Sequence, residues 1–182
     1  MKIKKVNAVL SLLSTLGLAV HIFCQAGSYY LFESNHRLLQ VTGMFMELMV
    51  LLHMILSVYS LFVSHDSKTI RYKKLNIRTY MQRITALAMV VLLPLHILCM
   101  KIVSSQKSAG LFVICEAIQV LFFAAALYHF ALSFGNALVS LGFLDDRLKK
   151  SKIDKAMLVV ATSILVVASI LIIPAQYNKM LA

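Results

Sequence analysis

Five long apolar runs, separated by short polar connections, dominate this chain of 182 residues. A helix needs about 20 apolar residues, at 1.5 Å each, to cross a hydrocarbon core of about 30 Å. A soluble domain needs more polar surface than a chain that is 60% hydrophobic, with a mean hydropathy of +0.85, can supply. The sequence therefore predicts an all-α integral membrane bundle, a single transmembrane domain over residues 1–182, whose five transmembrane helices lie at residues 6–26, 41–63, 80–102, 109–135 and 156–174.

Basic residues are concentrated in alternate connections between these runs. The chain has 18 Lys and Arg against 7 Asp and Glu, and most of the basic residues lie in residues 2–5, 68–83 and 147–155. Basic connections stay on the cytoplasmic side of a membrane, so we expect the N-terminus to be cytoplasmic and the C-terminus to lie outside. Because the charges interrupt apolar runs, they indicate topology, and we expect no nucleic-acid partner. We interpret the basic start and first run as a retained helix, not a signal peptide.

One histidine lies in each of the first four runs: His21, His53, His96 and His129. An imidazole inside hydrocarbon is costly unless it has a partner, so an intramembrane histidine is a candidate functional residue. A single one could equally serve a hydrogen bond to a neighbouring helix. Four, one per helix, favour axial ligation of heme iron, a common role of histidine in membrane cytochromes.

The depths of these histidines predict how they pair. At 1.5 Å per residue, His21 and His96 lie about 22 Å and about 24 Å from the inner ends of their helices. His53 and His129 lie about 18 Å and about 28 Å from the outer ends of theirs. We therefore expect two b-type hemes with histidine ligands on both sides, an outer heme on His21 and His96 and an inner heme on His53 and His129.

Other metal centres fit the sequence less well. A zinc or di-iron site would use carboxylates close to histidine, and neither Glu47 nor Glu116 has that spacing. The three cysteines have no CxxC spacing, which argues against a zinc or iron–sulfur site. We expect them to be free thiols that pack as small hydrophobic side chains: Cys24, Cys99 and Cys115.

Several polar residues inside or beside the runs are further candidates. Arg83, a turn past Tyr80, could pair with a heme propionate or extend to the membrane surface. A second group lies toward the outer side, where it could form either a quinone and proton site or only an interfacial polar rim. This group consists of Glu47, Gln40, His36 and Glu116.

Two motifs resemble a known family. They are Gln82-Arg83-Ile84-Thr85 followed by Leu95-His96, and Tyr128-His129-Phe130 followed by Gly135-Asn136 and Val139-Ser140-Leu141-Gly142. Together they resemble the membrane cytochrome b subunit of succinate dehydrogenases and fumarate reductases, in its single-subunit, five-helix, diheme form. The resemblance implies the same two heme pairs, menaquinone as the quinone, and a bacterial inner (plasma) membrane. It also implies flavoprotein and iron–sulfur partner subunits on the cytoplasmic face.

The predicted function is therefore a membrane anchor and electron conduit of a succinate:quinone or quinol:fumarate oxidoreductase. The chain has neither a Rossmann glycine motif nor cluster cysteines, so dicarboxylate chemistry would belong to a partner, whereas the quinone reaction could occur here. Two alternatives remain: a diheme cytochrome b of another quinone-linked dehydrogenase, and a small membrane transporter or scaffold without heme, whose histidines handle protons or hydrogen bonds.

Overall fold

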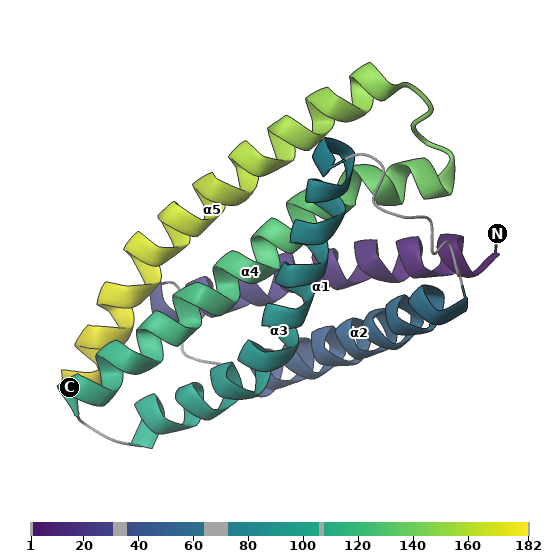
Figure 1. Ribbon diagram of the computed structural model, residues 1–182. Coiled ribbons are helices and arrows are strands. Elements are labelled where there is room, and N and C mark those ends of the chain that lie inside the picture. The colour runs from purple at the N-terminus through teal and green to yellow at the C-terminus, as the bar shows by residue number, and fades with distance from the viewer. Residues whose placement is uncertain (1, 31–35, 64–72, 106–107, 182) are drawn as a thin grey trace. The chain divides into compact units, whose positions relative to one another are not determined.

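A computed structural model describes residues 2–30, 36–63, 73–105 and 108–181. These residues form five α-helices and contain no strand (Figure 1). The helices are α1 (Lys2–Tyr30), α2 (His36–Val63), α3 (Lys73–Ser105), α4 (Ala109–Leu141) and α5 (Arg147–Leu181). The prediction of an all-helical chain with five long apolar helices is confirmed.

Each predicted apolar run lies within one of these helices, and every helix extends beyond its run at one end or both. The reason is that backbone hydrogen bonding continues wherever i to i−4 pairs can form, whereas an apolar run marks only the hydrocarbon segment. The fifth run was expected to end at Pro174, but α5 continues to Leu181 with Pro174 inside it. Pro94 likewise lies inside α3.

All five helices are long and apolar enough to cross a membrane. Their outward surfaces are also apolar: Leu16, Leu87, Val113 and Ile170 expose 62 to 66% of their surface. Apolar side chains displayed along the whole length of a helix are suited to lipid and are unfavourable in water. The chain is therefore a multi-pass membrane protein.

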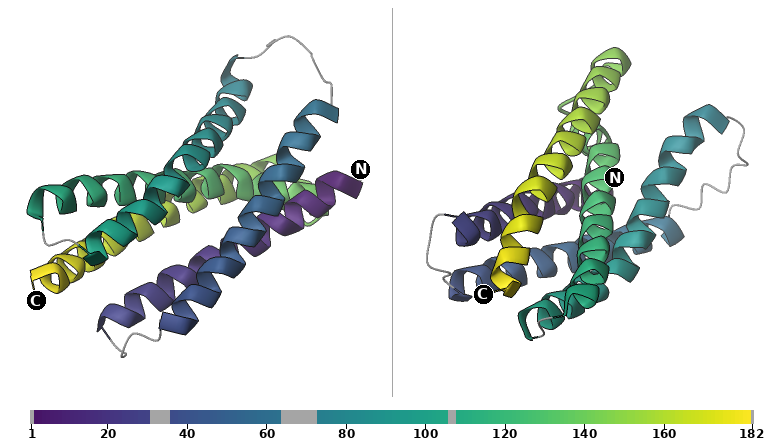
Figure 2. Two further views of the ribbon diagram at one scale, coloured as in Figure 1. Left: turned by 90° about the horizontal axis from the view of Figure 1, so that it is seen from below. Right: turned by 90° about the vertical axis from the view of Figure 1, so that its left-hand side faces the viewer.

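The described chain divides into two structural parts. The first consists of Met1–Lys73 with Ser133–Ile153, and the second of Lys74–Leu132 with Asp154–Ala182. In the first part, α1 and α2 lie side by side and antiparallel (Figures 1 and 2). Gly17 of α1 meets Met46 of α2 so closely that a Cβ at Gly17 would lie 3.6 Å from the Met46 main chain.

The C-terminal end of α4 also belongs to the first part, and Gly142 ends this helix. Gly142 has a φ of 86°, which residues with a side chain rarely adopt. Its N–H donates to the Val139 carbonyl (3.1 Å), and the N–H of Phe143 donates to the Leu138 carbonyl (3.0 Å). These two bonds define a Schellman motif, which satisfies the last carbonyls of the helix. The predicted apolar run ends at residue 135, and α4 continues past it to Leu141.

In the second part, α4 and α5 pack antiparallel through small residues. Ala131 of α4 is fully buried and Ala161 of α5 is 2% exposed, and they form a core with Leu127. Partly buried apolar side chains surround this core: Phe123, Met157, Leu158 and Leu165. Small residues allow two helix backbones to approach closely, which is a main source of helix association within lipid.

Replacing Ala131 with Leu is expected to destabilise the second part. The larger side chain would force α4 and α5 apart, and overpacking of this kind costs about 1–3 kcal/mol. The midpoint of thermal unfolding in detergent should fall for Ala131→Leu. It should change little for the control Ala156→Leu, because Ala156 is exposed on α5. Equal effects of the two substitutions would contradict this packing.

Candidate functional site

His21 of α1 lies against the backbone of α2. A Cβ added at Gly43 would be in ordinary van der Waals contact with the imidazole, 3.7 Å from Cε1 and 3.8 Å from Nδ1 of His21, so His21 and Gly43 face each other. His21 is half-buried. The antiparallel pairing of α1 and α2 therefore sets its height at the level of Gly43.

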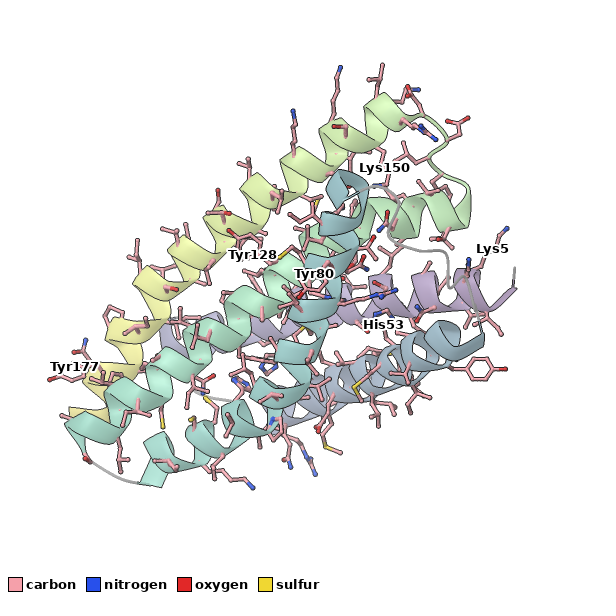
Figure 3. The ribbon with its side chains drawn as sticks, in the orientation of Figure 1. Lys5, His53, Tyr80, Tyr128, Lys150 and Tyr177 are labelled. Atoms are coloured by element: carbon pink, nitrogen blue, oxygen red, sulfur yellow. The ribbon has the colours of Figure 1, made fainter. Side chains whose placement is uncertain are left out.

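His53 of α2, labelled in Figure 3, lies beside the N-terminal part of α1. It belongs to a polar cluster with Asn7 and Ser57. The backbone of Asn7 is a hydrogen-bond partner of its imidazole. The Asn7 amide also bonds to Ser57, with Nδ2 donating to Oγ at 3.1 Å and Oγ donating to Oδ1 at 3.3 Å. Because Ser57 follows His53 by one helical turn, both side chains face α1. Sequence reasoning missed Asn7 and Ser57, although polar residues inside apolar runs were a usable signal.

The two histidines of the first part thus stand at different levels. His53 lies about ten residues beyond Gly43 along α2, which corresponds to about 15 Å at 1.5 Å per residue.

In the second part, His96 of α3 makes a reciprocal contact with Gln119 of α4. His96 Nδ1 bonds to Gln119 Oε1, and Gln119 Nε2 donates to the main-chain carbonyl of His96 at 3.3 Å. Phe122, one turn further along α4, stacks on the imidazole with a centroid distance of 4.8 Å and an interplanar angle of 29°. The orientation of the His96 ring is thus restrained by two α4 side chains.

His129 of α4 makes the corresponding contact to α3. Its Nδ1 lies 3.0 Å from the main-chain carbonyl of Gln82 and 3.2 Å from Thr85 Oγ1. The Thr85 hydroxyl donates to the carbonyls of Met81 and Gln82, both at 3.0 Å, so toward His129 it acts as an acceptor. Gln82 and Thr85 belong to the first sequence motif, and they contact His129 through the Gln82 main-chain carbonyl and the Thr85 hydroxyl.

The spacing of the second pair of histidines equals that of the first. Gln119, which marks the level of His96, precedes His129 by about ten residues, or about 15 Å along α4. Each pair of helices thus holds one histidine at each of two levels. The pairing of His21 with His96, and of His53 with His129, joins residues of different parts and stays a prediction.

The hydrogen bonds of His96 and His129 define which ring nitrogen carries the proton. Carbonyl oxygens only accept, so Nδ1–H is the donor in both residues. In the neutral ring the lone pair is then on Nε2, the nitrogen farthest from the backbone. Histidines that bind metal commonly donate the other ring N–H to a carbonyl or carboxylate in this way. The Nδ1–H bonds of His96 and His129, with the lone pair on Nε2, therefore fit the role of an axial ligand of heme.

The described residues contain no group of three or more His, Cys, Asp and Glu side chains that could hold a metal ion. The three cysteines are free thiols, as predicted, with Cys99 and Cys115 buried.

The remaining predicted residues fall into different environments. Tyr80 and Arg83 are exposed on α3, and Gln40 and Glu47 are exposed on α2. His36 begins α2, and its side chain lies outside the described set. Glu116 is 7% exposed and lies one turn before Gln119 on α4. Of the three outer polar candidates whose side chains the structure describes, Glu116 alone is buried, and it belongs to the second part.

Arg78, which sequence reasoning treated only as a topological charge, joins three helices. From α3, its Nε donates to the Leu132 carbonyl of α4 at 3.1 Å, and its Nη2 donates to the same oxygen at 3.0 Å. Its Nη1 forms an ion pair with Asp154 of α5, whose side chain is 8% exposed. The signal for this pair was Asp154, an acidic residue two positions before the last apolar run.

Comparison with known proteins gives no family assignment. No family model, no curated protein and no solved structure matches the chain. The likeness described above is one of motifs and helix order, and the function must be argued from the site.

Replacing Arg78 with Leu is expected to destabilise the second part strongly. The substitution removes the positive partner of a buried carboxylate, a loss that typically costs about 3–5 kcal/mol. Thermal unfolding in detergent should show a large fall for Arg78→Leu and a small one for Arg37→Leu, which removes the same charge from an exposed position on α2. Equal small effects would mean that the ion pair contributes little.

Proposed function

We propose that this chain is a diheme cytochrome b, the membrane anchor and electron conduit of a succinate:quinone or quinol:fumarate oxidoreductase. The observation that carries the heme assignment is the shared arrangement of His96 and His129, which both donate Nδ1–H to a carbonyl oxygen at levels about 15 Å apart. Bound heme would supply one-electron transfer. The residues of this chain would hold it and orient its ligands.

The spacing within each pair of helices limits how the histidines can share hemes. Two histidine nitrogens that hold one iron would have to lie on the order of 4 Å apart, about twice a metal–nitrogen bond. His21 and His53 are separated by about 15 Å along α2, and His96 and His129 by the same distance along α4. A heme with two histidine ligands would therefore take one histidine from each pair. The proposed pairs, His21 with His96 and His53 with His129, meet this condition.

A simpler reading is that these histidines only connect helices. A connecting histidine can use either ring nitrogen, whereas both His96 and His129 use Nδ1. In the neutral ring this choice leaves the lone pair on Nε2. The repetition at two levels, with one histidine on each of four helices, supports the ligand reading over a transporter or scaffold.

The proposed partner enzyme rests on the two motifs and on the distribution of charge. Lys and Arg in alternate connections support a cytoplasmic N-terminus and a basic cytoplasmic face. The two motifs are the ground for proposing a bacterial plasma membrane. Flavoprotein and iron–sulfur subunits would dock on that face, and menaquinone is the proposed quinone. For proton exchange with the quinone, Glu116 is the best-supported candidate, because it is buried one turn from the residue that bonds His96. Arg83, a turn past Tyr80, is the proposed propionate partner.

The purified chain is expected to contain two b-type hemes. A reduced-minus-oxidised visible spectrum should show the sharp bands of six-coordinate heme, at two hemes per chain. His53→Ala and His129→Ala should each remove one heme, and the double variant should still hold one. Combining His53→Ala with His21→Ala should remove both, because the two residues belong to different hemes. His65→Ala, in a connection between helices, is the matched control and should retain two.

A folded protein without heme would refute this proposal and favour the transporter or scaffold. Retention of one heme by the His21→Ala/His53→Ala variant, with loss of both by His53→Ala/His129→Ala, would refute the pairing alone.

The partner assignment is tested by isolation of the tagged chain from its native membranes. A flavoprotein and an iron–sulfur protein should co-purify, and succinate should reduce the hemes in that complex. Lys149→Glu with Lys152→Glu should weaken this association, because both lysines are exposed in the proposed cytoplasmic connection. Lys101→Glu, exposed on the opposite side of the predicted topology, should not. Co-purification of a different dehydrogenase would support the alternative cytochrome b.

A further inference from the structure

We propose that Gln119 is a positioning residue that holds His96 in the orientation and protonation state of an axial ligand and so adjusts the reduction potential of one heme. This inference rests on the proposed function, since it concerns a ligand of the outer heme. Gln119 lies within the fourth apolar run and has no counterpart among the residues that the sequence motifs singled out.

The two bonds between Gln119 and His96 define the amide orientation. Gln119 Nε2 donates to the main-chain carbonyl of His96 at 3.3 Å, an acceptor that only the amide nitrogen can serve. The amide oxygen therefore faces the ring, where it accepts from Nδ1–H. One side chain thus binds both the backbone and the ring of the same residue, so that the imidazole cannot rotate without breaking a bond.

A second contact restrains the ring from its face. Phe122 follows Gln119 by three residues, so both side chains lie on the same side of α4. Phe122 is buried and stacks on His96 at 4.8 Å between centroids. Gln119 therefore fixes the in-plane direction of the imidazole, and Phe122 fixes its plane.

The contrast with His129 shows why a substitution at Gln119 can change the hydrogen bond of a heme ligand. The acceptors for His129 are the main-chain carbonyl of Gln82 and the hydroxyl of Thr85, which itself donates to the backbone. No side-chain substitution removes the carbonyl. The acceptor for His96 is a side-chain oxygen, and its strength changes with residue type. A stronger acceptor makes the ligand more basic and favours oxidised iron, and a lost acceptor has the opposite effect.

The test compares Gln119→Glu and Gln119→Leu by potentiometric titration of the purified diheme protein. The outer heme should be harder to reduce in Gln119→Glu and easier to reduce in Gln119→Leu. A tenfold change in the equilibrium constant of reduction, the size expected for each, corresponds to about 59 mV for one electron. Gln82→Leu is the matched control: it removes a glutamine side chain from α3 but keeps the main-chain carbonyl, so the outer potential should not change.

Shifts in opposite directions cannot arise from a general loss of stability, which would act alike in both variants.

A heme-free readout is the ¹⁵N NMR spectrum of labelled histidine in the apoprotein. The Nδ1-protonated form of His96 should predominate in the unsubstituted chain and decrease in Gln119→Leu. Two hemes with unchanged potentials in both variants would overturn the role of Gln119 and leave the cytochrome assignment intact. A folded wild-type chain without heme would overturn both.

Discussion

The absence of water from the hydrocarbon core is the constraint on which the rest of this structure depends. A polar side chain within a span has to find its partner on another helix or in its own backbone, because each unsatisfied group costs several kcal/mol. Two of the contacts between helices illustrate this rule. Asn7 and Ser57 connect α1 with α2, and Gln119 and His96 connect α4 with α3. Many of the apolar side chains face outward, where they suit lipid.

These contacts also set the relative height of neighbouring helices. Packing between apolar surfaces alone leaves sliding weakly opposed, since most apolar side chains are interchangeable partners. A directed bond such as that from His129 to the Gln82 carbonyl has one favourable height. The equal spacing of the histidines in α1–α2 and α3–α4 is a consequence of such bonds. It agrees with a similarity between two tetrapeptides, His21-Ile-Phe-Cys24 of α1 and His96-Ile-Leu-Cys99 of α3. Each tetrapeptide begins at the histidine of the corresponding level in its own pair of helices.

The functional site was predictable to different extents at different residues. The four histidines stood out because a titratable side chain is rare in an apolar run. Their local partners did not stand out: Gln119 lies in the same kind of run, but its role depends on which side of α4 faces α3. Arg78 and Arg83 lie five residues apart with similar neighbours, yet Arg78 reaches Leu132 and Asp154 while Arg83 is exposed. Sequence reasoning emphasised Arg83, because helix rotation about its axis cannot be derived from an apolar run that extends around the whole helix.

The sequence by itself determined five apolar helices, their approximate extents and the presence of one histidine in each of the first four. These properties depend on composition along the chain, since transfer into hydrocarbon is local. Only the tertiary structure decided which atoms meet: the Nδ1 bonds of His96 and His129, the contact of His21 with Gly43, and the junction of three helices at Arg78. These depend on helix rotation and register, which directed contacts between residues distant in sequence determine.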